Sequence, residues 1–171
     1  MVKQTKRILF VEDVFASIAA IWDIIVAEHC EWMPVLRSNV PDAWRYLCCQ
    51  PVDAAVIDVM LPAVEGVPPW TEGWYLAAWV RQIPRYTPPE LLTPTPAGDV
   101  LQMWGRMPLA LLTARTLTGL RDEEHLPPLN VVQQDSREER STRGSNAIRF
   151  FAKAETDALD VIEWLTATLS D

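Results

Sequence analysis

Residues 54–62 read AAVIDVMLP, in which four consecutive apolar residues lead directly into Asp58. Strands buried on both faces, as in a parallel sheet, are apolar at successive positions, whereas half-exposed strands alternate. Two more runs, Ile8–Val11 and Leu109–Leu112, have the same character. The three runs therefore predict the central strands of a parallel sheet.

Two weaker strand candidates accompany the central three. Ile148–Ala152 is interrupted by Arg149, so we expect it nearer an edge of the sheet, and Trp32–Leu36 is the other candidate. Helical spacing of apolar residues between the strands predicts four helices, at Phe15–Ala27, Pro41–Cys49, Trp74–Arg81 and Asp157–Leu169, the last with Thr156 as its cap. Strands that alternate with helices indicate an α/β fold with helices on both faces of the sheet.

Two segments do not fit a compact version of this fold. Pro84–Arg106 contains five prolines, which remove backbone donors and disfavour helix, so we expect irregular structure there. Thr116–Asn146 is long for a connection and includes the charged run Ser136–Arg143, which is typical of a loop, a lid or a solvated segment. Within it, Leu117–His125 is the best candidate for a short helix.

Length and charge restrict the class of protein. A chain of 171 residues suits one domain. Its formal net charge of -8 argues against nonspecific nucleic-acid binding, which needs a basic surface. The sequence has no apolar run of the roughly 20 residues that a membrane span needs. Its basic start is soon followed by Glu12 and Asp13, which makes a poor signal peptide, so we expect a cytoplasmic protein.

The three cysteines, Cys30, Cys48 and Cys49, have no metal-ligand spacing. In a reducing compartment they are most simply small apolar residues. A redox-active pair at Cys48 and Cys49 is the less favoured interpretation.

Polar side chains stand directly after the buried runs. Glu12 and Asp13 follow the first, Asp58 the second, Thr113 the third and Lys153 the fourth. Ligands of open α/β sheets bind at the carboxyl ends of the strands, so we expect these five side chains to share one crevice. Crowded carboxylates need compensating charge, and Mg²⁺ prefers oxygen ligands and often joins carboxylates to phosphate. The set therefore indicates phosphoryl chemistry with Mg²⁺, in which Asp58 is the best-placed nucleophile.

Four motifs in this order resemble the receiver domains of bacterial two-component systems: ILFVED at 8–13, VIDVMLP at 56–62, LLTA at 111–114 and FFAK at 150–153. Val64–Gly66 is similar to the turn that follows the phosphorylated strand in that family. The resemblance implies a single receiver domain over residues 1–171 with a flavodoxin-like, doubly wound sheet of five parallel strands in the order 2-1-3-4-5. It also implies inserted loops at about 67–73, 84–106 and 116–146.

The resemblance assigns roles to the strand-end residues. Asp58 would accept the phosphoryl group, and Glu12, Asp13, Asp58 and the backbone carbonyl of Met60 would hold Mg²⁺. Thr113 and Phe150 would act as the switch pair, and Lys153 would contact the phosphoryl oxygens. An aromatic residue on a strand is also commonly a core residue, so for Phe150 both interpretations stay open.

The resemblance also implies a phosphoryl donor and a downstream partner. A histidine kinase or phosphotransfer protein would supply the phosphoryl group, and a downstream protein, with a homodimer as a further option, would read it. The chain ends with its last predicted helix, so we expect a stand-alone receiver that contacts neither DNA nor membrane. We expect no enzyme activity beyond self-phosphorylation from a donor and self-dephosphorylation.

The sequence departs from the family pattern after the lysine, where Ala154 replaces a proline that forms a cis bond. A cis bond to a residue other than proline costs about 2.5–4 kcal/mol, so the bond is either trans with a displaced lysine or strained. Met60 and Arg115 lie where the family tunes the lifetime of the phosphoryl group.

Two other functions compete with phosphorelay signalling. A degenerate receiver that binds partners without phosphorylation is the first. A metal-dependent phosphohydrolase with an aspartate nucleophile is the second, and it is disfavoured because Met60 stands where such enzymes have their second acid.

Overall fold

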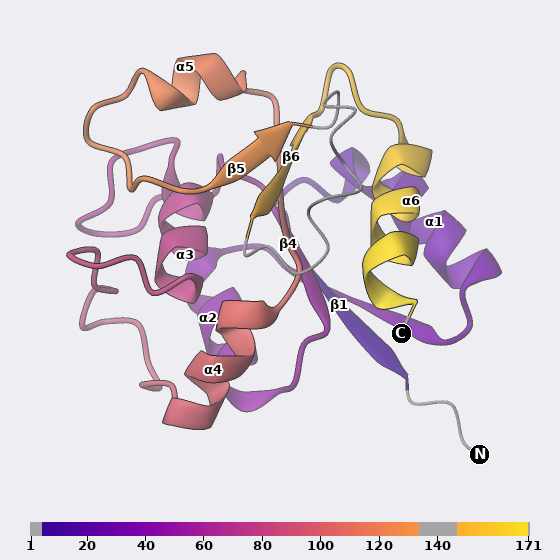
Figure 1. Ribbon diagram of the computed structural model, residues 1–171, viewed down its shortest axis with the longest axis horizontal. Coiled ribbons are helices and arrows are strands. Elements are labelled where there is room, and N and C mark those ends of the chain that lie inside the picture. The colour runs from indigo at the N-terminus through magenta and orange to yellow at the C-terminus, as the bar shows by residue number, and fades with distance from the viewer. Residues whose placement is uncertain (1–4, 134–146, 171) are drawn as a thin grey trace.

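The computed structural model describes residues 5–133 and 147–170, which form an α/β fold around one all-parallel sheet (Figure 1). Six strands lie in the order β2-β1-β3-β4-β6-β5. Their bounds are β1 Lys6–Val11, β2 Trp32–Arg37, β3 Ala54–Ile57, β4 Leu109–Thr113, β5 Val131–Gln133 and β6 Ile148–Ala152. The predicted fold class is confirmed, with one strand more than the five expected.

The additional strand, β5, comes from the predicted insertion at 116–146 and pairs in parallel with β6, Val131 opposite Ile148. Three residues are too short a run to show a periodic pattern, so the sequence did not reveal this strand. Because β5 takes the edge, β6 is not the edge strand that the five-strand order implied; it lies between β4 and β5. The charged run Ser136–Arg143 lies outside the described residues.

Helices cover both faces of the sheet (Figure 1). Helices α1 (Ala19–Glu28) and α6 (Ala158–Leu169) lie on one face, and α2 (Val40–Cys49), α3 (Glu72–Val80) and α4 (Gly98–Arg106) on the other. On β1, Ile8 and Phe10 pack toward the first pair while Leu9 and Val11 pack toward the second group. This two-sided burial is why the run is apolar at every position. Among the described residues, no helix is long and apolar enough to cross a membrane.

The first and last helices begin later than predicted. Residues Phe15–Ser17 form a short 3₁₀ turn, named η1, before α1 begins at Ala19. The cap of α6 is Asp157 rather than the predicted Thr156. The Asp157 carboxylate accepts hydrogen bonds from the amides of Leu159 and Asp160, and the Asp160 carboxylate accepts one from the Asp157 amide. This reciprocal capping box stabilises the helix start better than one threonine hydroxyl would.

The insertions are more ordered than predicted. The expectation of irregular structure throughout Pro84–Arg106 is wrong, because α4 occupies Gly98–Arg106, beyond the last proline at Pro96. In the insertion at 116–146, the predicted short helix forms as α5 (Leu117–Arg121) and ends before His125.

The proline-rich part of the insertion at 84–106 is hydrogen-bonded to α2. The Trp44 indole and the Cys48 thiol both donate to the carbonyl of Pro94, at 3.0 Å and 3.3 Å. Burial, with the neighbouring Cys49, raises the pKa of the Cys48 thiol to about 11, so it is a protonated donor at neutral pH. Trp44 also contacts Trp104 of α4, with ring centroids 5.2 Å apart. These contacts join α2, the loop and α4 into one layer.

We predict that Trp44→Phe destabilises the protein by about 1–3 kcal/mol, because it removes an indole hydrogen bond and leaves space in the core. Urea unfolding followed by circular dichroism measures the change. Trp70→Phe is the matched control: Trp70 is 62% exposed, so its effect should stay within about 0.5 kcal/mol. Equal effects of the two substitutions would show that the Pro94 contact does not stabilise the insertion.

Candidate functional site

The predicted site residues lie together at the carboxyl ends of the strands because β1, β3, β4 and β6 all run in the same direction. Backbone hydrogen bonds continue past the strand ends and hold them together. The Asp58 amide donates to the carbonyl of Val11, and the Lys153 amide donates to the carbonyl of Thr113, both at 2.8 Å. Residues that are far apart in the sequence are thereby set side by side.

The centre of the site is an ammonium group shared by two buried carboxylates. Lys153 Nζ lies 2.7 Å from Glu12 Oε2 and 2.7 Å from Asp58 Oδ2. Glu12 is 2% exposed and Asp58 is 5% exposed. The remaining oxygens accept from the backbone, Asp58 Oδ1 from the Met60 amide at 3.0 Å and Glu12 Oε1 from the Val14 amide at 3.1 Å. Both carboxylates are therefore held in fixed orientations.

The lysine reaches this position without the proline of the family pattern. The cis bond among the described residues is Thr93–Pro94, so Lys153–Ala154 is trans. The carbonyl of Ala152 accepts the amides of Glu155 and Thr156, both at 2.9 Å, and these bonds form the turn after β6. The trans bond does not displace the Lys153 side chain from Asp58.

Burial and charge act on the site together. Burial, assisted by the negative charge of Asp58, raises the pKa of Glu12, although the Lys153 hydrogen bond opposes this. Burial by itself would lower the pKa of Lys153, but the two carboxylates outweigh it and the net pKa is raised. The lysine is therefore a stable cation at neutral pH, while the acidic side of the site retains uncompensated negative charge.

Three carboxylates of the site can approach one cation. Glu12, Asp13 and Asp58 each offer an oxygen, and these oxygens all lie within 4.8 Å of one another. Asp13 is exposed, so a cation there would keep part of its water shell, as Mg²⁺ prefers. Three carboxylates beside one ammonium carry two excess negative charges when ionised. The oxygen donors and the charge both fit a divalent metal ion.

The two predicted switch residues are buried. Thr113 is fully buried, and its hydroxyl oxygen accepts from the Arg115 amide at 3.2 Å. Phe150 is 1% exposed, pairs with Leu111 across the sheet and packs in the core on the α2–α4 side. Its position satisfies the core interpretation, and its role as a switch stays a prediction.

No protein-family model matches the sequence, and no curated protein matches it either. Solved structures, however, are similar along nearly the whole chain. The receiver domain of the sensor histidine kinase PA1611 from Pseudomonas aeruginosa PAO1, whose crystal structure has a magnesium ion coordinated in the active site cleft, is 17% identical. Its TM-score is 0.58, and the match covers 98% of this chain and 99% of that domain.

Two further structures agree. A CheY-like response regulator receiver domain from Methanospirillum hungatei JF-1 has a TM-score of 0.55 at 15% identity, covering 98% of this chain and 95% of that one. The Mn²⁺-bound form of the response regulator Rcp1 has a TM-score of 0.54 at 14% identity, covering 96% and 94%. The chain has the fold of response-regulator receiver domains. Identities this low establish a shared fold, so the function must be argued from the site itself.

One residue of this receiver fold that the sequence analysis missed is Gly73, in the first turn of α3. A Cβ atom at Gly73 would lie 1.8 Å from the carbonyl oxygen of Asp58, and its amide donates to the carbonyl of Val59 at 3.0 Å. The helix therefore packs directly against the backbone of the predicted phosphoacceptor. Gly66, in the predicted turn Val64–Gly66, does have a positive φ of 80° but has open space around it. A glycine directly before the predicted helix Trp74–Arg81, at a position where a chain can approach closely only without a Cβ atom, was the available signal.

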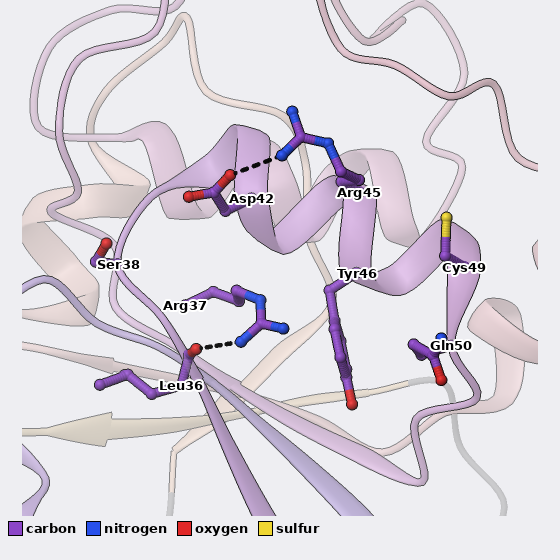
Figure 2. Close-up of a pocket in the computed structure, with 8 residues that line it drawn as sticks. All are labelled: Leu36, Arg37, Ser38, Asp42, Arg45, Tyr46, Cys49 and Gln50. Atoms are coloured by element: carbon purple, nitrogen blue, oxygen red, sulfur yellow. Dashed lines mark hydrogen bonds and ion pairs between the residues drawn. The ribbon is translucent and has the colours of Figure 1, made fainter.

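A hollow of about 640 Å³ lies between the end of β2 and α2 (Figure 2). Arg37 lies over the ring of Tyr46, 4.3 Å from its centroid, and also donates to the carbonyl of Leu36. Arg45 is paired with Asp42. Both arginines are thus engaged, and the predicted site residues do not line this hollow.

We predict that Gly73→Ala destabilises the protein by at least about 2 kcal/mol, because the methyl group cannot fit against the Asp58 carbonyl without moving backbone. Thermal or urea unfolding measures this loss. Gly105→Ala in α4 is the control, since Gly105 has open space around it, and it should be neutral or stabilise by about 0.5–1 kcal/mol. A Gly73→Ala protein as stable as the wild type would refute the close approach.

Proposed function

We propose that this chain is a response-regulator receiver that accepts a phosphoryl group on Asp58 in the presence of Mg²⁺. The observation that carries the proposal is the Lys153 ammonium, 2.7 Å from both Asp58 and Glu12, beside an acidic cluster completed by Asp13. Such a set combines a carboxylate nucleophile with two sources of positive charge, the Lys153 ammonium and a bound Mg²⁺, which phosphoryl transfer requires.

The chemistry assigns a task to each side chain. An oxygen of Asp58 forms the new P–O bond while the P–N bond to the donor's imidazole breaks, and that imidazole takes up a proton from solvent. Lys153 stabilises the charge on the phosphoryl oxygens. Glu12, Asp13, Asp58 and, by the family pattern, the Met60 carbonyl would hold Mg²⁺, which supplies the remaining charge neutralisation. Thr113 follows the phosphoryl group as a hydrogen-bond donor, with Phe150 as its partner in the switch.

The donor in this proposal is a histidine kinase or a phosphotransfer protein, and the output is contact with a downstream protein. A net charge of -8 supports protein contact over direct DNA binding. The proposal includes action as a stand-alone receiver, with no catalysis beyond its own phosphorylation and dephosphorylation. Three free thiols are in keeping with a reducing cytoplasm.

A second candidate function is a receiver whose partner binds independently of phosphorylation. The added strand β5 and the ordered insertions favour it, because they provide surface that does not depend on Asp58. The two functions separate on Asp58→Ala: full partner binding and full biological activity in this variant would support the second.

We expect wild-type protein with Mg²⁺ and acetyl phosphate to gain one phosphoryl group by intact-mass spectrometry, and beryllofluoride to change its tryptophan fluorescence. Asp58→Asn should lose both responses because the nucleophile is gone, and a metal chelator should prevent both in the wild type. Asp23→Asn, an exposed position on α1, is the control and should behave as the wild type. Persistence of both responses in Asp58→Asn would defeat the assignment.

Removal of the shared cation should have opposite effects on metal binding and phosphorylation. We predict that Lys153→Gln binds Mg²⁺ about tenfold more tightly, because one positive charge no longer competes for the carboxylates. The same variant should phosphorylate much more slowly. Calorimetric titration with MgCl₂ measures the affinity, and Lys153→Arg, which keeps the charge, should stay near the wild type. Weaker Mg²⁺ binding by folded Lys153→Gln would contradict the proposed geometry.

A further inference from the structure

Two insertions meet beside the phosphoacceptor and line a hollow of about 520 Å³. Residues 68–70 form one wall, and Arg115, Glu123 and His125 form another, with Met60 also in the lining. The Met60 amide is bound to Asp58 Oδ1. Met60 therefore links the hollow to the Oδ1 side of the Asp58 carboxylate, whereas Lys153 occupies the Oδ2 side.

The cation in this hollow is Arg115, and it is already engaged. Its guanidinium Nη2 forms an ion pair with Glu123 Oε1, and the two side chains are 27% and 24% exposed. The other oxygen of Glu123 lies 3.4 Å from His125 Nε2. The Arg115 backbone amide donates a hydrogen bond to the Thr113 hydroxyl oxygen. The backbone of Arg115 is therefore held next to the predicted switch residue.

Glu123 is held firmly in its place. The Tyr75 hydroxyl donates to the carbonyl of His125 at 3.0 Å, and the Trp74 indole donates to the carbonyl of Pro127 at 2.8 Å. Two bonds of the segment's own backbone, Glu123 N to Leu120 O and Leu126 N to Glu123 O, fix the turn that carries the carboxylate. Glu123 is therefore a preorganised acceptor for Arg115, fastened to α3.

We propose that Glu123 is a positioning residue that holds the Arg115 guanidinium away from Asp58. Glu123 and a phosphoryl group on Asp58 then compete for this guanidinium. This rests on the proposed phosphorylation of Asp58. A bound phosphoryl group carries more negative charge than a carboxylate and has three acceptor oxygens, and guanidinium groups bind such oxygens in pairs. Phosphorylation would shift Arg115 toward Asp58, which breaks its pair with Glu123 and reports the modification to the insertion.

The test is the affinity for beryllofluoride with Mg²⁺, followed by tryptophan fluorescence in the full chain. Glu123→Gln should bind about fivefold more tightly than the wild type because Arg115 is released, and Arg115→Gln should bind more weakly. The double variant should match Arg115→Gln, since Glu123 acts only through Arg115. Glu124→Gln, an exposed neighbour, is the control and should be unchanged. Glu123→Asp keeps the charge on a shorter side chain and should give an intermediate gain, which also covers the case that Glu123→Gln fails to fold.

The outcomes are distinguishable. If the wild type does not bind beryllofluoride, the proposed function fails and this inference falls with it. If the wild type binds but neither Glu123 variant gains affinity, the inference alone is overturned. A gain that persists in the Arg115→Gln background would equally overturn it, because the effect would then not pass through the arginine.

Discussion

The site depends on one ammonium group that serves two buried carboxylates. Burying ionised groups is costly unless they are paired and hydrogen-bonded, and Glu12 and Asp58 meet this condition through Lys153 and one backbone amide each. Lys153 lies 141 residues from Glu12 and 95 from Asp58 in the sequence. Parallel strands whose carboxyl ends lie side by side bring these distant groups within 2.7 Å, so the topology of the sheet supplies the geometry of the site.

The elements of the fold that the sequence predicted are those that depend on local patterns of residues. Uninterrupted apolar runs such as Ala54–Ile57 depend only on burial on both faces, and the polar residue after each run depends only on where the strand ends. These two signals were sufficient for the central strands β1, β3 and β4 and for the position of the acidic cluster. The fold class also needed the helical spacing of apolar residues between the strands, and β2 and β6 were weaker candidates. Helix α6 was predicted from another local pattern, the helical spacing of its apolar residues, although its cap was placed one residue too early, at Thr156.

What the sequence did not predict depends on contacts between separate segments of the chain. The strand β5 has three residues and exists because β6 offers an edge to pair with. Helix α4 follows a proline-rich loop whose carbonyl at Pro94 is bound by Trp44 and Cys48 of another helix. Gly73 matters because α3 touches the Asp58 carbonyl. The Arg115–Glu123 pair joins residues whose types are common on any surface. In each case the physical reason is a contact, which no single stretch of sequence contains.

The position of β6 also explains why Ala154 can follow the lysine. The strand is paired with β4 on one side and with β5 on the other, and its ladder with β4 continues to the bond between the Lys153 amide and the Thr113 carbonyl. A turn closed on the Ala152 carbonyl then carries the chain away. The direction of the lysine is thus set by the backbone before residue 154 is reached. In this receiver fold, the ladder between β6 and β4 orients Lys153 toward Asp58 through an ordinary trans bond, and a special bond after the lysine is not needed.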